Sequence, residues 1–226
     1  MKKSVIIVAG GTGTRMDSAL PKQFLLLGHK PILIHAINAF VQVFPDISVV
    51  VALPLAYTDG WNELCRRYTF TQPHKVVQGG ETRFHSVKNA LSVIPPDHLV
   101  AIHDSARPLV TPSLIMRVFQ AALQFGNAVP VLPVTESLRI INDSGNRSID
   151  RNLYRVVQTP QVFSCQTLKK AYEAGFEKTF TDDATVIEKL GEKIHLLEGE
   201  KTNIKITQPS DLVIAGLLLK KMNIII

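Results

Sequence analysis

The sequence predicts an α/β protein with a doubly wound, mostly parallel, Rossmann-like sheet. Short apolar runs rich in β-branched residues alternate with helical patterns along the 226-residue chain. The runs lack polar alternation, which is typical of parallel strands buried on both faces. No internal repeat, low-complexity tract or linker interrupts this order. We therefore expect a single domain over residues 1–226, with an inserted β-hairpin arm at about 133–155.

Strands and helices are predicted in alternation. The strand candidates are Val5–Ala9, Ser48–Leu53, Lys75–Val77, Leu99–His103 and Ala128–Leu132. Helices are expected at Pro31–Val43, Thr58–Tyr68, Thr82–Val93 and Thr111–Phe125, the last with Thr111 as N-cap and proline next to it. Beyond the arm we expect helices at Gln166–Phe176 and Asp182–Leu190, a strand near Ile194–Leu197, and a last strand and helix after Asn203, with Thr207 as the cap.

The segment 133–155 breaks the alternation. A turn signal at residues 142–146 lies between the apolar segments Leu138–Ile141 and Ser148–Leu153, which predicts a hairpin. An isolated two-stranded hairpin is at best marginally stable in water, so its apolar side chains need a surface to bury them. The hairpin could fold back on its own domain or reach a second subunit. We favour the second option and expect a homodimer that forms through this arm.

Composition excludes several classes of protein. With 46% hydrophobic and 19% charged residues, the chain is not a disordered protein. The net charge of +6 is spread over the sequence, so we expect no nucleic-acid partner. The apolar stretch Leu212–Leu219 falls short of the roughly 20 residues that span a bilayer, and we expect a cytoplasmic protein without membrane association. Neither the cysteines, Cys65 and Cys165, nor the scattered histidines have metal-ligand spacing.

A glycine-rich loop carries the strongest chemical signal. It reads Gly10-Gly11-Thr12-Gly13-Thr14-Arg15-Met16, follows the first predicted strand, and continues to Pro21-Lys22-Gln23-Phe24. A dinucleotide fingerprint would need a third glycine at Met16, and the Gly-Lys-Ser/Thr of a Walker A loop is absent. The loop therefore predicts a phosphate site of another kind, in which backbone N–H groups approach a triphosphate and Arg15 and Lys22 clamp it.

Further motifs follow in a fixed order. They are Gly79-Gly80-Glu81-Thr82-Arg83 with Ser86, His103-Asp104-Ser105-Ala106-Arg107-Pro108, Asp150-Arg151, Gln158-Thr159-Pro160-Gln161, Thr181-Asp182-Asp183-Ala184-Thr185 and Asn203-Ile204-Lys205. Together with the glycine loop they resemble sugar- and polyol-phosphate nucleotidyltransferases, and most specifically the 2-C-methyl-D-erythritol 4-phosphate cytidylyltransferase family. The resemblance covers nearly the whole chain, and its specificity comes from the ordered set.

The resemblance implies a nucleotide-binding half. Backbone groups of Ala9, Gly10, Gly11 and Gly13 would hold the CTP phosphates, and Arg15 and Lys22 would stabilise charge on the α-phosphate. The residues that would face the cytosine are Gly80, Glu81, Arg83 and Ser86. Asp104 and Ser105 would lie at the ribose and the metal–triphosphate, with Mg²⁺ bound mainly through the CTP phosphates. Taken alone, Ser86 reads as an ordinary helix residue, and Asp182 and Asp183 could simply begin a helix.

The resemblance also implies an acceptor-binding half and a reaction. Methylerythritol phosphate would be held by Arg107, Ser137, Arg151, Thr159 and Lys205, although Arg107 could instead brace its own loop. Arg15, Lys22, Arg151 and Lys205 would be catalytic. Ser137 occupies a place where the family commonly has threonine, and it lies with Arg151 on the arm, so both could act in the neighbouring subunit. The implied reaction transfers cytidylyl from CTP to the acceptor phosphate and releases pyrophosphate.

Two alternatives stay open at the level of sequence. Ribitol-5-phosphate cytidylyltransferase shares the nucleotide motifs, but Asp150-Arg151, Ala106 before Arg107 and the run Asp182–Glu188 favour the methylerythritol enzyme. A non-catalytic nucleotide- or RNA-binding module is disfavoured because simple binding could rely on backbone amides, without Arg15 and Lys22. No catalytic triad can be assigned. We expect His103 to be packed and hydrogen-bonded, and both cysteines to be inert.

Overall fold

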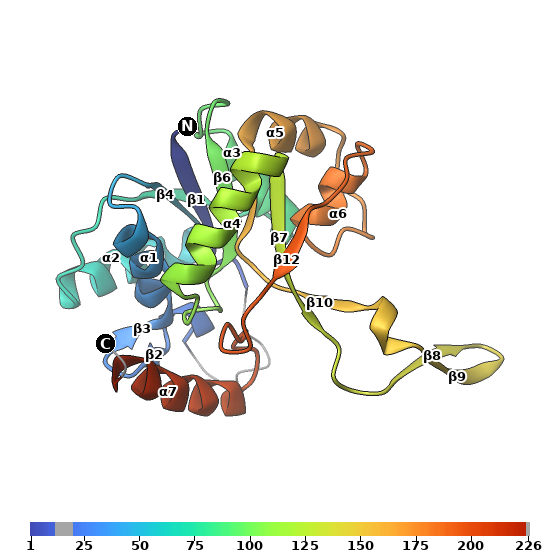
Figure 1. Cartoon of the computed structure of the whole chain (residues 1–226). Helices are drawn as coiled ribbons and strands as arrows, with labels where there is room; N and C mark the ends of the chain where they lie inside the picture. Colours follow the sequence, from blue (N-terminus) through green and yellow to red (C-terminus); the bar gives the residue numbers. More distant parts are fainter. Residues whose placement is uncertain (12–19, 225–226) are drawn as a thin grey trace.

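The computed structural model describes residues 1–11 and 20–224. Its main sheet contains β1 (Lys3–Val8), β4 (Ser48–Leu53), β5 (Lys75–Gln78), β6 (Leu99–Asp104), β7 (Asn127–Pro133), β10 (Arg155–Val157), β11 (Gln161–Ser164) and β12 (Leu196–Glu198). The strand order is β10-β7-β11-β6-β1-β4-β5, and β12 also pairs with β7 (Figure 1). The predicted α/β class is confirmed. Residues 12–16 of the predicted glycine loop, which include Gly13 and Arg15, lie outside the described residues.

The sheet is parallel through β6, β1, β4 and β5 and mixed on the other side. β11 runs antiparallel to both β6 and β7, and β10 runs antiparallel to β7. Neither β10 nor β11 was predicted as a strand. The reversal has a simple cause: β7 leads outward into the arm, and the chain comes back through β10 and β11 in the opposite direction.

Helices cover both faces of the sheet. They are α1 (Ile32–Val43), α2 (Thr58–Arg67), α3 (Arg83–Leu91), α4 (Pro112–Phe125), α5 (Cys165–Glu173), α6 (Asp183–Glu188) and α7 (Pro209–Ile224). Thr111 caps α4 as predicted, accepting a hydrogen bond from the N–H of Leu114. Asp182 and Thr185 form a capping box at the start of α6, so Asp182 does begin a helix. Over the described residues, none of the helices combines the length and apolar character needed to cross a membrane.

The C-terminal segment corrects two predictions. The strand expected after Asn203 does not form; instead the N–H of Ile206 donates to the carbonyl of Ala106, which ties this segment to the loop after β6. Thr207 is not the cap of the last helix. Its N–H and hydroxyl both donate to the carboxylate of Asp211, which lies in the first turn of α7. The carboxylate, rather than the threonine, therefore organises this helix start.

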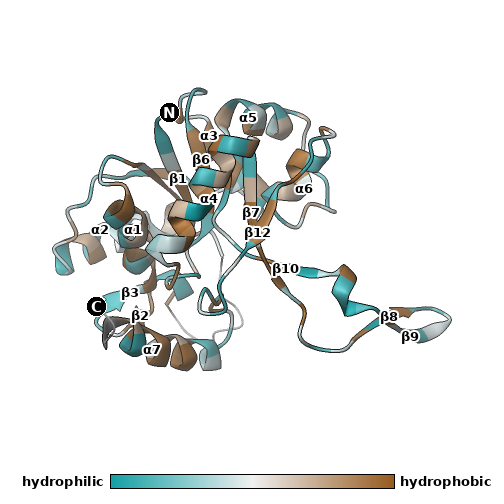
Figure 2. Cartoon of the chain, in the orientation of Figure 1, coloured by the Kyte–Doolittle hydropathy of each residue, from teal (hydrophilic) through white to brown (hydrophobic). Residues whose placement is uncertain are grey.

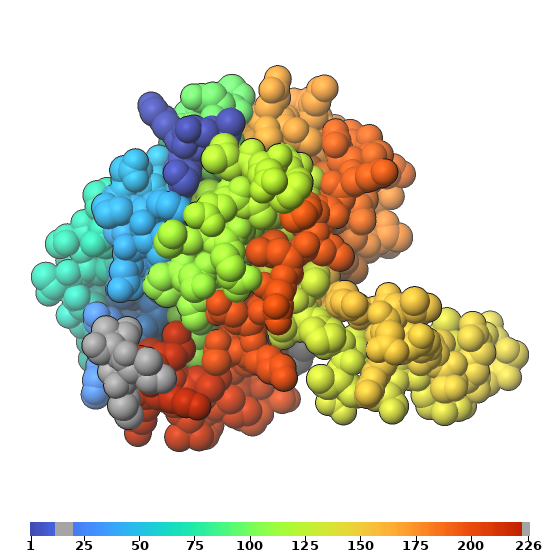
Figure 3. Space-filling view, viewed as in Figure 1, coloured from blue at the N-terminus to red at the C-terminus, as the bar shows by residue number. Residues whose placement is uncertain are grey.

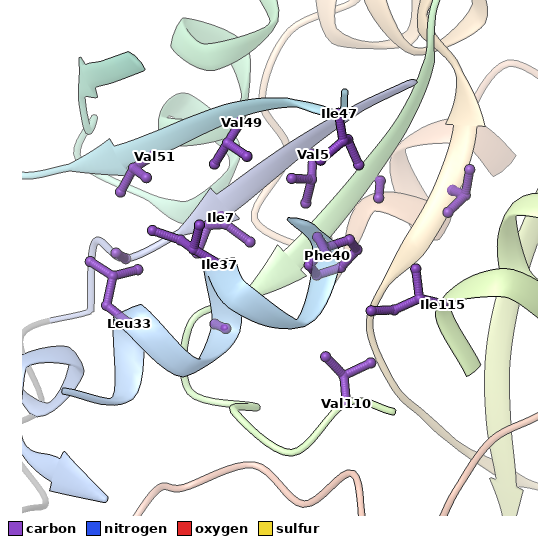
Figure 4. Packing of buried hydrophobic residues seen from close by; sticks show 14 of the residues in the cluster. Val5, Ile7, Leu33, Ile37, Phe40, Ile47, Val49, Val51, Val110 and Ile115 are labelled. Carbon is purple, nitrogen blue, oxygen red and sulfur yellow. The ribbon is translucent and has the colours of Figure 1, made fainter. Parts of the chain in front are cut away.

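The core lies on both faces of the sheet because successive side chains of a strand point to opposite sides. Val5 and Ile7 of β1 pack with Leu33, Ile37 and Phe40 of α1 on one face (Figure 4). The residue between them belongs to the cluster on the other face, together with side chains of α3 and α5. This burial on both sides explains why the central strands lack polar alternation.

The predicted arm projects from the body. Its strands β8 (Leu138–Asn142) and β9 (Gly145–Ile149) form a two-stranded sheet of their own, followed by the 3₁₀ turn η4 (Arg151–Leu153) where the second strand was predicted to continue. The arm extends away from the globular part in Figures 1 and 3, and Figure 2 shows apolar colour on it near β8. Ile141 and Leu153 are each 80% exposed. The hairpin therefore does not fold back on its own domain, and its contact with a second subunit stays a prediction.

Candidate active site

A pocket of about 330 Å³ opens where β1 and β6 end. Ligands of open α/β sheets bind at this edge, outside the carboxyl ends of the strands. The pocket is lined by Val8, Gly10, Gly11, Lys22, Gly80, Glu81, Thr82, Arg83, Ser86, Asp104, Ser105, Ala106 and Lys205. Four motifs that are far apart in the sequence thus meet at one place, which supports the predicted nucleotide half and part of the acceptor half.

The start of the glycine loop is fixed to the sheet and to the Pro-Lys-Gln-Phe motif. The N–H of Ala9 donates to the carbonyl of Ala52, and the carbonyl of Ala9 accepts from the amide of Gln23 at 2.9 Å. Both backbone polar groups of Ala9 are therefore hydrogen-bonded within the protein, whereas Gly10 and Gly11 line the pocket. This bond also places Lys22, the neighbour of Gln23, at the pocket wall.

Ser86 shapes the second loop of the pocket. Its buried hydroxyl accepts from the N–H of Gly80 at 3.0 Å and donates to the carbonyl of Thr82 at 3.0 Å. A Cβ added to Gly80 would lie 2.3 Å from the Cβ of His85, so only glycine fits there. Ser86 is a residue of α3, and its hydroxyl also ties this helix to the backbone of Gly80.

Asp104 is surrounded by cations at the end of β6. Its carboxylate lies 2.7 Å from Nζ of Lys205, 3.3 Å from Nε of Arg83 and 4.0 Å from Nε of Arg107. Burial alone would raise the pKa of Asp104, but the positive charges of Arg83, Lys205 and Arg107 outweigh it and hold the pKa well below its ordinary value. The carboxylate is therefore anionic at neutral pH and is available to bind a cation or a hydroxyl group.

Arg107 braces the loop after β6. Its guanidinium is buried and donates to the carbonyls of Asn203, at 2.7 Å, and Val157, at 3.4 Å. The side-chain amide of Asn203 in turn donates to the carbonyl of Thr159 at 2.8 Å. Of the two roles considered for Arg107, the structure shows the one in which it holds its own loop in place. Its contact with the acceptor stays a prediction.

A directed chain of hydrogen bonds links His103 to Asp104. Nε2 of His103 lies 3.0 Å from the carbonyl of Arg107, which can only accept, so Nε2 carries the proton. Nδ1 then accepts from the hydroxyl of Thr159 at 3.1 Å, and that hydroxyl accepts from the N–H of Asp104 at 3.1 Å. Burial lowers the pKa of His103 to about 4, so the imidazole is neutral. His103 is packed and hydrogen-bonded, as predicted.

The hydroxyl of Thr159 is thereby engaged inside the protein rather than turned to the pocket. Sequence reasoning assigned it to the acceptor phosphate and missed its link to His103, because His103 lies in β6 and Thr159 lies in the segment between β10 and β11, in a different motif. The sequence did contain one signal for this link: a histidine in a strand expected to be buried, directly before Asp104, needs a hydrogen-bond partner inside the protein. Binding of the acceptor by Thr159 stays a prediction.

The two arm residues lie outside this chain's own pocket. Ser137 is exposed, and the exposed guanidinium of Arg151 donates to the carbonyl of Thr135. Neither side chain lines the cavity that Lys205 and Asp104 share. The structure therefore brings Lys22, Asp104 and Lys205 together within one chain but does not add Ser137 or Arg151 to them.

The donor set fits a magnesium ion carried by a triphosphate. Among the described residues no group of three or more histidine, cysteine or acidic side chains is arranged to hold a metal. Asp104, however, presents one anionic carboxylate to the pocket. Mg²⁺ in phosphate-transfer sites is commonly held by one or two carboxylates together with substrate phosphates, and two acidic residues, Asp104 and Glu81, line this pocket.

Comparison with known proteins decides the family. The family model for 2-C-methyl-D-erythritol 4-phosphate cytidylyltransferase matches residues 4–221. The chain belongs to this family. Relatives of that name from Bacteroides thetaiotaomicron and Porphyromonas gingivalis are 48% and 46% identical, over 97% and 96% of this chain and 100% and 98% of theirs. The resemblance inferred from the ordered motifs is thus confirmed.

Solved structures of family members have the same architecture. The cytidylyltransferase of Thermus thermophilus superposes with a TM-score of 0.75 at 35% identity, covering 97% of this chain and 100% of its own. The Francisella tularensis enzyme gives 0.81 at 30% identity, covering 96% and 100%. A family member from Anaerococcus prevotii shares the fold with a TM-score of 0.83 at 24% identity, covering 97% and 96%.

Proposed function

We propose that this chain transfers the cytidylyl group of CTP to 2-C-methyl-D-erythritol 4-phosphate, giving 4-diphosphocytidyl-2-C-methyl-D-erythritol and pyrophosphate. The observation that carries the proposal is the pocket in which Gly10, Gly11, Lys22, the Gly80 loop, Asp104 and Lys205 meet. Membership of the family supports the same donor and acceptor.

The chemistry needs charge stabilisation more than proton transfer. The acceptor phosphate is already anionic near neutral pH, so its oxygen attacks the α-phosphorus without a strong general base. A P–O bond forms, the bond from the α-phosphorus to the bridging oxygen breaks, and pyrophosphate leaves with the electron pair. The barrier is mainly the approach of like charges, which positioning and cations relieve. Lys22 and Lys205 provide such cations at the pocket wall.

Each part of the pocket has a role in this proposal. The backbone of Gly10 and Gly11 binds phosphate oxygens, and Arg15 and Lys22 stabilise charge at the α-phosphate. The Gly80 loop, fixed by Ser86, receives the cytosine. Asp104 would hold the magnesium ion that accompanies the triphosphate, and this ion would supply neutralisation of phosphate charge. Lys205 binds the acceptor phosphate.

The proposed enzyme is a homodimer formed through the arm. Ser137 and Arg151 then reach the neighbouring pocket and complete its acceptor half. The exposed apolar side chains of Ile141 and Leu153, and the position of Arg151 outside its own chain's pocket, support this arrangement. Burial of such side chains against a second copy is the ordinary way to stabilise a projecting hairpin.

The direct test is release of pyrophosphate from CTP and Mg²⁺, with methylerythritol phosphate and ribitol 5-phosphate compared as acceptors. We expect turnover with methylerythritol phosphate and little with ribitol 5-phosphate. Preference for ribitol 5-phosphate would overturn the acceptor but not the reaction class. Absence of CTP binding in the presence of Mg²⁺ would overturn the function itself.

A further inference from the structure

A buried carboxylate lies behind the pocket and is not explained by the reaction. Asp183, the first residue of α6, is fully buried. One of its oxygens lies 2.6 Å from Nη2 of Arg83, and the other accepts a hydrogen bond from the hydroxyl of Tyr172 at 2.6 Å. Burial and the negative charge of Asp183 raise the pKa of Tyr172 well above its ordinary value, so the phenol stays a donor.

Arg83 is shared between this hidden carboxylate and the one in the pocket. Its Nη2 contacts Asp183 at 2.6 Å, whereas its Nε reaches Asp104 at the longer distance of 3.3 Å. Burial alone would lower the pKa of Arg83, but Asp183 and Asp104 outweigh it and raise the pKa, so the guanidinium stays charged. The shorter contact is the one to Asp183, which does not line the pocket.

Helix capping does not account for Asp183. The start of α6 is already held by the capping box of Asp182 and Thr185. Gln161 adds two further bonds, donating to Asp182 at 2.8 Å and accepting from the N–H of Ala184 at 3.0 Å. A buried carboxylate is costly unless its partners compensate it, and here the partners are Arg83 and Tyr172. Its place in the fold is therefore tied to Arg83.

We propose that Asp183 is a positioning residue that acts through Arg83: it draws the guanidinium toward α6 and so keeps Asp104 able to engage the cation that accompanies the nucleotide. Without the charge of Asp183, Asp104 is the carboxylate left to Arg83, in addition to Lys205 and Arg107. The arginine would then pair more closely with Asp104 and compete with a metal ion. This inference rests on the proposed function.

The test measures metal binding separately from nucleotide binding. In Asp183→Asn, we expect the affinity for Mn²⁺ at saturating CTP, measured by electron paramagnetic resonance, to fall about 10-fold, as is typical when an outer-shell partner of a metal site is lost. The Mg²⁺ concentration for half-maximal turnover should rise in parallel. Affinity for CTP in EDTA should be unchanged or tighter, because the pocket has gained positive charge. Glu188→Gln, an exposed position on the same helix with the same change of charge, is the control.

The double variant Arg83→Gln/Asp183→Asn supplies the rescue. It leaves no buried charge unpaired and removes the guanidinium from Asp104, so Mn²⁺ affinity should return to the wild-type value or exceed it. This prediction holds even if Asp183→Asn alone does not fold. Unchanged Mn²⁺ affinity in Asp183→Asn, or weaker affinity in the double variant, would overturn the inference. Failure of the wild-type protein to bind CTP or release pyrophosphate would instead overturn the proposed function.

Discussion

Nζ of Lys205 lies 2.7 Å from a carboxylate oxygen of Asp104. The pair joins the segment before α7 to the last residue of β6, two parts of the chain that meet at the pocket. The side chain of Asp104 is 12% exposed and that of Lys205 41%, so the lysine keeps a free approach for an anion while its partner holds it in place. This asymmetry suits an ammonium group that binds an incoming phosphate.

Replacement of Lys205 should impair use of the acceptor. For Lys205→Ala we expect kcat/KM for methylerythritol phosphate to fall by about 10²–10³, the range typical for loss of one charge-stabilising donor. Steady-state pyrophosphate release measures it, and CTP binding should change much less. Lys205→Arg should retain part of the activity, since the cation is kept. Equal loss of CTP affinity in Lys205→Ala would assign the lysine to the nucleotide instead.

Lys22 should matter for turnover to a similar degree. In Lys22→Ala we expect kcat to fall by at least about 10², because the cation that we propose to act at the α-phosphate would be lost. Single-turnover measurements at saturating CTP separate this loss from binding. Lys170→Ala, at an exposed lysine of α5, is the matched control and should behave as wild type. Near-native turnover in Lys22→Ala would remove this lysine from the mechanism.

Position 80 has no room for a side chain. In Gly80→Ala the new Cβ would lie 2.3 Å from the Cβ of His85, so the loop must shift and CTP affinity should fall by at least about 10-fold. Gly216→Ala is the control: it lies within α7, and an added Cβ there meets nothing within 4 Å. That change should raise helix stability by up to about 1 kcal/mol and leave CTP binding unchanged. Isothermal titration with CTP and thermal melting test both variants.

The neutral state of His103 predicts how stability depends on pH. Burial lowers its pKa from 6.5 to about 4. Between these values the unfolded chain binds a proton that the folded protein does not, so the free energy of unfolding falls as the pH drops through this window. The contribution amounts to about 2 kcal/mol between pH 7.5 and 5. Urea denaturation at both pH values measures it.

His103→Gln provides the comparison for this pH effect. The variant should be less stable at neutral pH because the bonds to Thr159 and Arg107 are disturbed. The variant should also lack the decrease in the free energy of unfolding that His103 causes at acid pH. The difference in this free energy between variant and wild type should therefore be smaller at pH 5 than at pH 7.5. Parallel pH profiles for the two proteins would show that His103 does not titrate in this way.

The arm should govern assembly without governing the fold. Ile141→Asp combined with Leu153→Asp changes two side chains that are each 80% exposed, so the stability of the single chain should be nearly unaffected. We expect the dimer to dissociate in sedimentation velocity, with loss of turnover. Leu217→Asp, at a residue of α7 that is 64% exposed, should leave the dimer intact. A wild-type protein that sediments as a monomer would contradict the proposed assembly.

Sequence patterns predicted the parts of the fold that depend on local signals. Ser48–Leu53 and the helix N-cap at Thr111 are found as predicted, since hydrophobic runs and capping residues act over a few neighbours. β11 was missed because it is only four residues long and begins within a motif that was interpreted for its chemistry, and because its pairing depends on the path back from the arm. Strand direction in a mixed sheet is set by such long-range connections.

The same distinction between local and long-range signals applies to the candidate site. The glycine loop, Lys22, Asp104 and Lys205 could be named from the ordered motifs, and those that are described line the pocket. The inward hydrogen bonds of Thr159 and the link of Arg83 to Asp183 could not be inferred, because each depends on which buried polar groups meet after folding. Motifs indicate which residues gather, while burial decides where each side chain points.

Pro133 and Arg155 face each other across β7 and β10, at the two roots of the arm. Because β7 and β10 are already paired there, residues 134–154 leave the sheet and return to it at neighbouring positions. We therefore expect the body of the protein to fold when residues 134–154 are replaced by a tight turn, and, on the proposed function, such a variant would bind CTP without forming the proposed dimer. On this proposal, association would depend on a segment that can be removed, whereas nucleotide binding would depend on the sheet and its loops.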